Sequence, residues 1–102
     1  MIEVRLDDRH AKLINELVEY VRDEDPLAIR WISRKALKDS KEIFKLKIMS
    51  SATRDEITEE CASKLCWLVD EISRMHPNEE ERKEVTYQVF KLLRMFAKGE
   101  RK

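Results

Sequence analysis

The sequence contains few of the residues that interrupt regular structure. It has one glycine, Gly99, and two prolines, Pro26 and Pro77. Glycine and proline mark most turns and break helices, so their scarcity favours long helices joined by short connections. Amides are scarce too, since Gln88 is the only glutamine, a usage that resembles that of thermophile proteins.

Long apolar runs are absent as well. No stretch approaches the roughly 20 apolar residues needed to cross a bilayer, and the N-terminus shows no apolar signal region. We therefore expect a cytoplasmic protein with no membrane partner. With 102 residues we expect a single small domain, or a module of residues 1–38 followed by a helical extension over residues 39–102. A core of this size is modest, so dimerisation would add to its stability.

Residues with catalytic or metal-binding chemistry are few. Cys61 and Cys66 point about 140° apart around a predicted helix and cannot form a disulfide within it, so we expect two buried free thiols. His10 falls in the apolar arc of the first predicted helix, as expected of a hydrogen-bonded neutral histidine. Neither His10 nor His76 has a partner at a metal-ligand spacing, and no glycine-rich phosphate loop is present. We expect no enzymatic activity, no cofactor and no metal.

The formal net charge is zero, but the charges are not evenly spread. Residues 26–54 hold eight Lys or Arg against two Asp or Glu, a net charge of +6. Residues 1–25 carry a net charge of −4 and residues 55–102 a net charge of −2. A basic middle between acidic ends predicts a localised positive face, which the overall charge conceals.

Helix-capping patterns divide the chain into helices. A polar residue that can cap, an acid three residues later and a proline at the first helical position are all typical of a helix start. Such starts occur at Asp7 or Asp8, at Asp25 before Pro26, at Asp39 with Glu42, at Thr53 with Glu56, and at Asn78 with Glu81. They predict helices near residues 8–23, 26–38, 54–75 and 79–98.

Residues 39–53 allow two interpretations. Phe44, Leu46 and Ile48 alternate with lysines, which suits an edge strand. The same segment can form helical turns, and we favour the helix.

The last two predicted helices each carry a continuous apolar stripe. The first stripe holds Ile57, Cys61, Leu65, Leu68, Ile72 and Met75, and the second holds Val85, Val89, Leu92, Leu93 and Phe96. Joined by a short break at residues 76–78, the two helices are expected to pack as an antiparallel hairpin. The predicted fold class is mainly all-α: a small bundle of four to five helices with this C-terminal hairpin, with or without a short N-terminal strand over residues 2–7.

Trp67 projects from the side of its helix opposite the stripe, among charged residues. Either it lies over Lys64 or Arg74 in a local cation–π contact, or it belongs to a protein interface. The second alternative would suit a helical adaptor or subunit.

Basic residues recur at helical spacing in and after the second predicted helix. Arg30, Arg34, Lys38, Lys41 and Lys45 would form one stripe if that helix ran through residue 45, with Trp31 and Lys35 alongside. Each phosphate that such a stripe neutralises releases counterions, and an indole offers a face for a base or sugar. The competing interpretation is a solvated face whose cations pair with the acidic first and third helices.

Residues 2–7 alternate strictly between apolar and charged side chains, and a lone strand needs a pairing partner. That partner is a second copy of the chain or residues 44–48, unless the segment simply extends the first helix. A helix with apolar Ala11, Ile14 and Leu17 follows, and after a short break comes Ala28-Ile29-Arg30-Trp31-Ile32-Ser33-Arg34-Lys35-Ala36-Leu37. In this order the first 38 residues resemble the ribbon-helix-helix DNA-binding module.

The resemblance implies a homodimer. Two chains would pair their strands into a ribbon that enters the major groove, with Arg5 among the outward residues and Val4 facing the core. Our leading hypothesis is a small dimeric nucleic-acid-binding regulator whose ligand is duplex DNA, contacted by Arg5, Arg30, Trp31, Arg34, Lys35, Lys38, Lys41 and Lys45. The alternative is a non-enzymatic helical-bundle adaptor or subunit that recognises another protein through Trp67 and the basic second helix.

Overall fold

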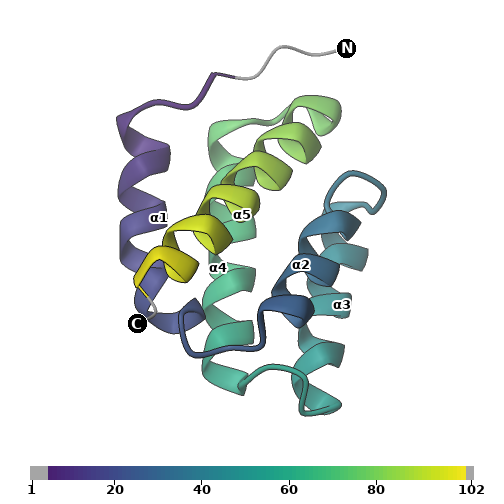
Figure 1. Cartoon of the computed structure of the whole chain (residues 1–102). Coiled ribbons are helices and arrows are strands. Elements are labelled where there is room, and N and C mark those ends of the chain that lie inside the picture. Colours follow the sequence, from purple (N-terminus) through teal and green to yellow (C-terminus); the bar gives the residue numbers. More distant parts are fainter. Residues whose placement is uncertain (1–4, 101–102) are drawn as a thin grey trace.

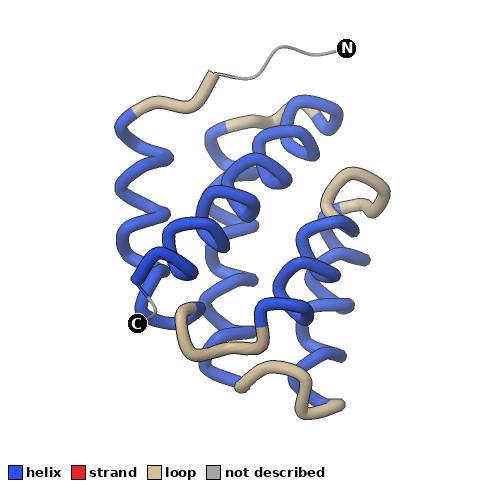
Figure 2. The backbone as a smooth tube through the Cα atoms, in the orientation of Figure 1, coloured by secondary structure: helices blue, strands red, loops and turns tan. Residues whose placement is uncertain are grey.

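The computed structural model describes residues 5–100, which form five helices (Figure 1). They are α1 (Asp8–Val21), α2 (Pro26–Lys35), α3 (Lys41–Thr53), α4 (Glu59–Met75) and α5 (Glu79–Glu100). No strand occurs in this part of the chain, and short loops join the helices (Figure 2). The prediction of a mainly all-α fold is confirmed. No helix in the described range is long and apolar enough to cross a membrane.

The helices form two layers. α4 lies between α1 and α3, and α5 crosses α1 and α4 with α2 beside it (Figure 1). α2 packs against α5 and α3. α4 and α5 run in opposite directions and touch, but the main neighbour of α4 is α3 and that of α5 is α1.

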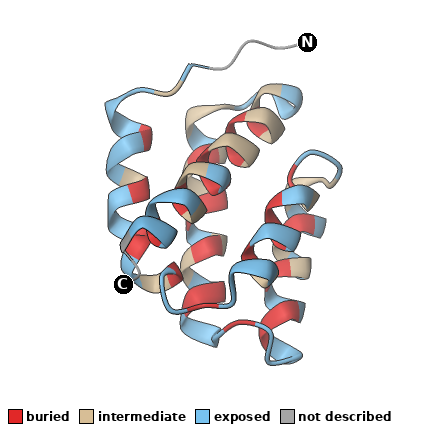
Figure 3. Cartoon of the chain, viewed as in Figure 1, coloured by how far each residue is buried: buried red, intermediate tan, exposed pale blue. Residues whose placement is uncertain are grey.

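The core lies between the two layers. Figure 3 shows buried residues along the inner faces of the helices and exposed residues on the outer faces. Phe44 of α3 and Phe90 of α5 are both fully buried, and their ring centroids lie 5.4 Å apart. All five helices contribute buried apolar side chains to one connected cluster.

Three predicted helix starts are confirmed. The side chains of Asp7, Asp25 and Asn78 each accept a hydrogen bond from a backbone N–H in the first turn of the following helix. These N–H groups have no acceptor within the helix, so a side-chain oxygen in this position stabilises the start.

Two predicted helix starts are wrong. Ser40, rather than Asp39, caps α3, and its Oγ accepts the backbone N–H of Ile43 at 3.3 Å. Residue 53 ends α3 instead of starting α4, which begins at residue 59 behind the cap Thr58. Between these helices Asp55 has a φ of 60°, the left-handed conformation that commonly ends a helix.

The helical interpretation of residues 39–53 is confirmed, and the edge strand is wrong. α3 runs over residues 41–53. Phe44 and Ile48, four residues apart, are both buried, whereas Leu46 between them is 66% exposed. A strand would have placed all three on one face.

The predicted N-terminal strand falls mostly outside the described residues. Residues 5–7 lead into α1 without forming a strand. Residues 1–4, and Val4 with them, lie outside the described range, so the ribbon and the homodimer remain predictions.

Candidate nucleic-acid interface

The structure divides the predicted basic stripe between two helices. α2 ends at Lys35, and the chain reverses before α3 begins at Lys41. Lys41 and Lys45 face α4, where the Asp70 carboxylate lies 3.3 and 2.9 Å from their Nζ atoms. Burial raises the pKa of Asp70, but its hydrogen bonds to Lys45 and Lys41 outweigh burial and hold the pKa below its ordinary value. The continuous stripe through residue 45 does not form. Lys41 and Lys45 instead form ion pairs with an acid of the same chain.

Of the cations in residues 26–54, those on α2 and the turn after it have no acidic partner among residues 5–100. They are Arg30, Arg34, Lys35 and Lys38. The other two cations of the basic middle segment pair with acids, Lys47 with Asp39 and Arg54 with Glu56. The positive charge of residues 26–54 is therefore concentrated on α2.

Trp31 lies among these cations and is 44% exposed. The Nζ of Lys35 lies 4.7 Å from the centroid of its ring, and the Cζ of Arg54 lies 5.9 Å from it. Both distances allow a cation–π contact. The indole and its cations together offer apolar and positively charged surface at one place.

The C-terminal part of α5 extends the basic surface. Arg94 and Lys98 of α5 and Arg30 of α2 line a hollow between the two helices, together with the exposed apolar side chains of Leu27 and Met95. None of the three cations has an acidic partner within the described range. Sequence reasoning missed Arg94 and Lys98, although their spacing of four residues places them on one face of a helix.

Among the described side chains on the lining of this hollow, Glu24 is the only carboxylate. Its side chain is almost fully buried and accepts hydrogen bonds from the backbone N–H and the hydroxyl of Thr58, at 3.1 and 2.7 Å. Glu24 thus stabilises the start of α4, and no ion pair joins it to any of the three cations around the hollow within residues 5–100.

Arg5 lies apart from this surface. It is exposed and precedes α1, and α1 and α2 lie on opposite sides of α5 (Figure 1). The structure does not bring Arg5 together with the cations of α2.

Trp67 does not make the local cation–π contact that the sequence allowed. Lys64 instead places its Nζ 5.1 Å from the ring centroid of Tyr20, and Arg74 pairs with Glu71. That interpretation is wrong because Tyr20 of α1 and Glu71 of α4 take up the two cations instead.

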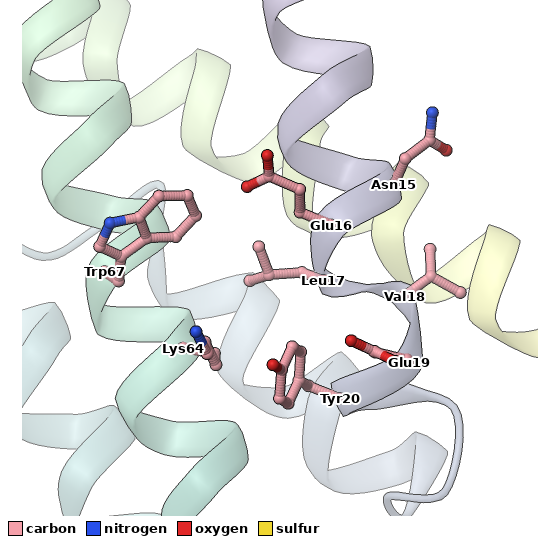
Figure 4. A pocket seen from close by; sticks show the side chains of 8 residues that line it. All are labelled: Asn15, Glu16, Leu17, Val18, Glu19, Tyr20, Lys64 and Trp67. Atoms are coloured by element: carbon pink, nitrogen blue, oxygen red, sulfur yellow. The ribbon is translucent and has the colours of Figure 1, made fainter.

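Trp67 lines a second hollow, between α4 and α1. Figure 4 shows its indole facing Glu16 and Leu17 of α1, with Lys64 below it. Trp67 is 38% exposed. The assignment of Trp67 to a protein interface therefore stays a prediction.

His10 and His76 form a hydrogen bond with each other, although they are 66 positions apart in the sequence. The backbone N–H of Asp7 donates to His10 Nδ1 at 3.0 Å, which leaves the proton of a neutral His10 on Nε2. This nitrogen lies 2.9 Å from His76 Nε2, and His76 Nδ1 lies 2.5 Å from a carboxylate oxygen of Glu81. Hydrogen bonds therefore run from Asp7 through both rings to Glu81, and every ring nitrogen is satisfied.

His10 is 1% exposed, as expected of a buried neutral histidine. Burial lowers its pKa, the nearby Asp7 carboxylate opposes this, and His76 lowers the pKa further. The predicted burial and hydrogen bonding of His10 are confirmed, and the lowered pKa favours its neutral form. The hydrogen bond between His10 and His76 could not be predicted, because residues this far apart in the sequence show no common pattern.

The two cysteines are free, as predicted. Burial raises the pKa of Cys61 to about 12, so this thiol carries no thiolate at neutral pH. Cys66 is half-buried, and burial also raises its pKa. Within residues 5–100 no three metal-ligating side chains gather in one place.

Comparisons with protein-family models, with curated proteins and with solved structures gave no match. We therefore infer function from the residues of this chain alone.

Proposed function

We propose that this protein binds nucleic acid through its basic α2–α5 surface, which consists of Arg30, Arg34, Lys35, Lys38, Arg94 and Lys98. The observation that supports this is the absence of acidic partners for these six cations within the described residues, in a chain whose formal net charge is zero. A cation without a partner is free to neutralise a phosphate and release its counterions.

Duplex DNA is the ligand we propose for this surface. Its phosphates are spaced regularly along the backbone, as the cations of α2 are along the helix. Leu27, Met95 and Trp31 are exposed beside these cations and supply apolar contacts to sugars or bases. In the predicted homodimer, two copies of the surface would contact successive stretches of one duplex, as in other dimeric DNA-binding proteins.

Two double variants that remove the same charge test the proposal. Arg30→Gln with Arg34→Gln removes two cations of the basic α2–α5 surface, and Lys41→Gln with Lys45→Gln removes two that pair with Asp70. Fluorescence anisotropy with a short labelled duplex measures affinity over a series of salt concentrations. We expect the arginine pair to weaken binding by roughly tenfold or more and to reduce the slope of log affinity against log salt by about 2.

The lysine pair is the matched control. Its affinity should change by no more than about twofold, and its salt slope should stay that of the parent. Equal losses in the two double variants, or no binding by the parent to duplex DNA or single-stranded RNA at micromolar protein, would contradict the proposal.

The hollow beside Trp67 supports a second candidate function, recognition of a protein partner. An exposed indole beside Glu16 and Glu19 suits a partner that presents an apolar side chain next to a basic one. Trp67→Ala should then abolish partner capture and leave DNA affinity unchanged. A loss of DNA affinity in Trp67→Ala would count against this separation of the two surfaces.

A further inference from the structure

A small pocket lies where the start of α3 meets the end of α4 and the first turns of α5. It is lined by Ser40, Lys41, Glu42, Ser73, His76, Pro77, Glu79 and Arg82, and its volume is about 280 Å³. That volume suits a small ion or the end group of a metabolite rather than a larger ligand. The pocket shares no lining residue with the basic α2–α5 surface.

Arg82 is the unusual residue of this pocket. It is 5% exposed, and both terminal nitrogens of its guanidinium are buried without a hydrogen-bond partner in the described part of the chain. A guanidinium stays charged at every ordinary pH and has five N–H donors, so this burial is strongly unfavourable unless an acceptor reaches it. Arg82 also precedes Val85 and Val89 on the buried face of α5, where an apolar residue would be expected.

Two further groups of donors surround the pocket. The hydroxyl of Ser73 on α4 is buried and has no hydrogen-bond partner. The first turn of α3 contributes the backbone N–H groups of Lys41 and Glu42, which have no acceptor within the helix because no helical carbonyl precedes them, and the Ser40 cap accepts only the N–H of Ile43. A helix start of this kind favours negative charge. The unpaired donors thus come from three helices.

We propose that this pocket binds a small oxyanion, a carboxylate or a phosphate group, which accepts hydrogen bonds from Arg82, Ser73 and the first turn of α3. The two parallel N–H groups at the end of a guanidinium match two oxygens of either group. Glu42 and Glu79 on the lining limit the charge of the ligand, although Glu79 is already paired with Lys83 at 3.4 Å. A singly charged carboxylate therefore binds more tightly than doubly charged phosphate at neutral pH.

Nitrogen-15 NMR of the parent protein tests binding directly. Sodium acetate and inorganic phosphate are titrated separately, with sodium chloride used to hold the ionic strength constant. We expect the Nε–H signal of Arg82 to shift and saturate, with acetate saturating at lower concentration than phosphate. Arg74, an exposed arginine paired with Glu71, is the internal control, and its signal should not saturate.

Thermal unfolding of matched variants provides a second measurement. At an acetate concentration ten times its Kd, the Tm of the parent should rise by roughly 5 °C or more. Arg82→Met removes the buried charge and keeps the length of the side chain, so it should fold with a Tm no lower than that of the anion-free parent and lose the response to acetate. Arg74→Met should keep the full response.

Ser73→Ala serves as a second variant if Arg82→Met does not fold. It should weaken acetate binding by roughly fivefold, since it removes one hydrogen bond to a charged group. The absence of a saturable shift at Arg82 with both anions would overturn the proposal, as would an unchanged acetate response in Arg82→Met. A lower Tm in Glu42→Gln with no anion response in the parent would assign Glu42 as the partner of Arg82 and would also overturn it.

Discussion

His10, His76 and Glu81 connect the start of α1 to the turn between α4 and α5. Only a neutral His10 accepts the N–H of Asp7 at Nδ1, and a second proton on either ring would set two N–H groups facing each other. The chain of hydrogen bonds therefore depends on both histidines being neutral.

We expect the free energy of unfolding to fall as the pH is lowered through 6.5, the ordinary pKa of histidine. Because burial lowers the pKa of folded His10, the unfolded chain binds the proton first, and stability is lost as the pH drops from 6.5 toward the lower folded value. Urea unfolding between about pH 8 and pH 5 measures this. His10→Leu should give a flatter profile in this window, and a profile parallel to that of the parent would contradict the assignment.

A second residue-scale prediction concerns Glu24. Glu24→Ala leaves the backbone N–H of Thr58 without its acceptor at the start of α4, so it should lower the free energy of unfolding by about 1–3 kcal/mol. Asp23→Ala is the control, because Asp23 is exposed and its change should stay within about 0.5 kcal/mol. Similar losses in both variants, measured by urea unfolding, would argue against the capping role of Glu24.

At the scale of elements, α3 carries apolar side chains on two faces. Phe44 and Ile48 are buried in the core, whereas Ile43, Leu46 and Met49 are exposed. A segment that is apolar on both sides shows little helical periodicity, and for this reason its sequence also suited a strand.

Two alanine substitutions distinguish the two faces of α3. Ile48→Ala should lower the free energy of unfolding by about 2–5 kcal/mol, because it opens a cavity in the core. Leu46→Ala should change it by less than about 0.5 kcal/mol, because its side chain is already in solvent. Chemical denaturation measures both, and equal losses would favour the alternation of a strand over the helix.

The helices could be predicted wherever their signals are local. Asp7, Asp25 and Asn78 cap helices through bonds that span two or three residues, and their patterns are visible in the sequence. The sequence places the start of α4 too early because Thr53 and Glu56 imitate a capping box, whereas the true cap, Thr58, accepts the backbone N–H of Cys61 with no acid at the third position. The bond between Thr58 and Glu24, 34 residues away, leaves no periodic pattern in the sequence.

The candidate site could be predicted only in part, for the same reason. The sequence indicates a basic second helix, but the continuous stripe depended on that helix running through residue 45, and the chain reverses at residues 36–40 instead. The pairing of Lys41 and Lys45 with Asp70, and the approach of Arg94 to Arg30, depend on how the helices pack. The spacing from Arg82 to Val85 and Val89 indicates that Arg82 lies on the buried face of α5. The groups that surround its guanidinium, however, depend on how the neighbouring helices pack.

At the scale of the whole molecule, internal pairing makes the charge distribution uneven. Asp70 neutralises the cations of α3 that face α4, while the cations of α2 face solvent unpaired within the described range. Zero net charge thus coexists with a strongly basic surface.

We expect all five helices to unfold in one cooperative transition, because they share one connected core. Trp31 reports on α2 and Trp67 on α4, so the variants Trp31→Phe and Trp67→Phe allow fluorescence to follow each layer separately. Each should give a urea midpoint equal to that from its own far-UV circular dichroism. Separate midpoints for the two tryptophans would instead indicate an independently folding module in residues 1–38.

The reversal between α2 and α3 places a cleavable site between two halves of one core. Leu37 and Lys38 are exposed there, while Ile29 and Ile32 of α2 stay buried. Trypsin that cuts after Lys38 would therefore leave two fragments held together without a covalent bond, since α1 and α2 pack on α5 from the other fragment. The same geometry makes residues 1–38 and 39–102 a natural pair for fragment complementation, in which neither peptide buries its apolar faces until the two meet.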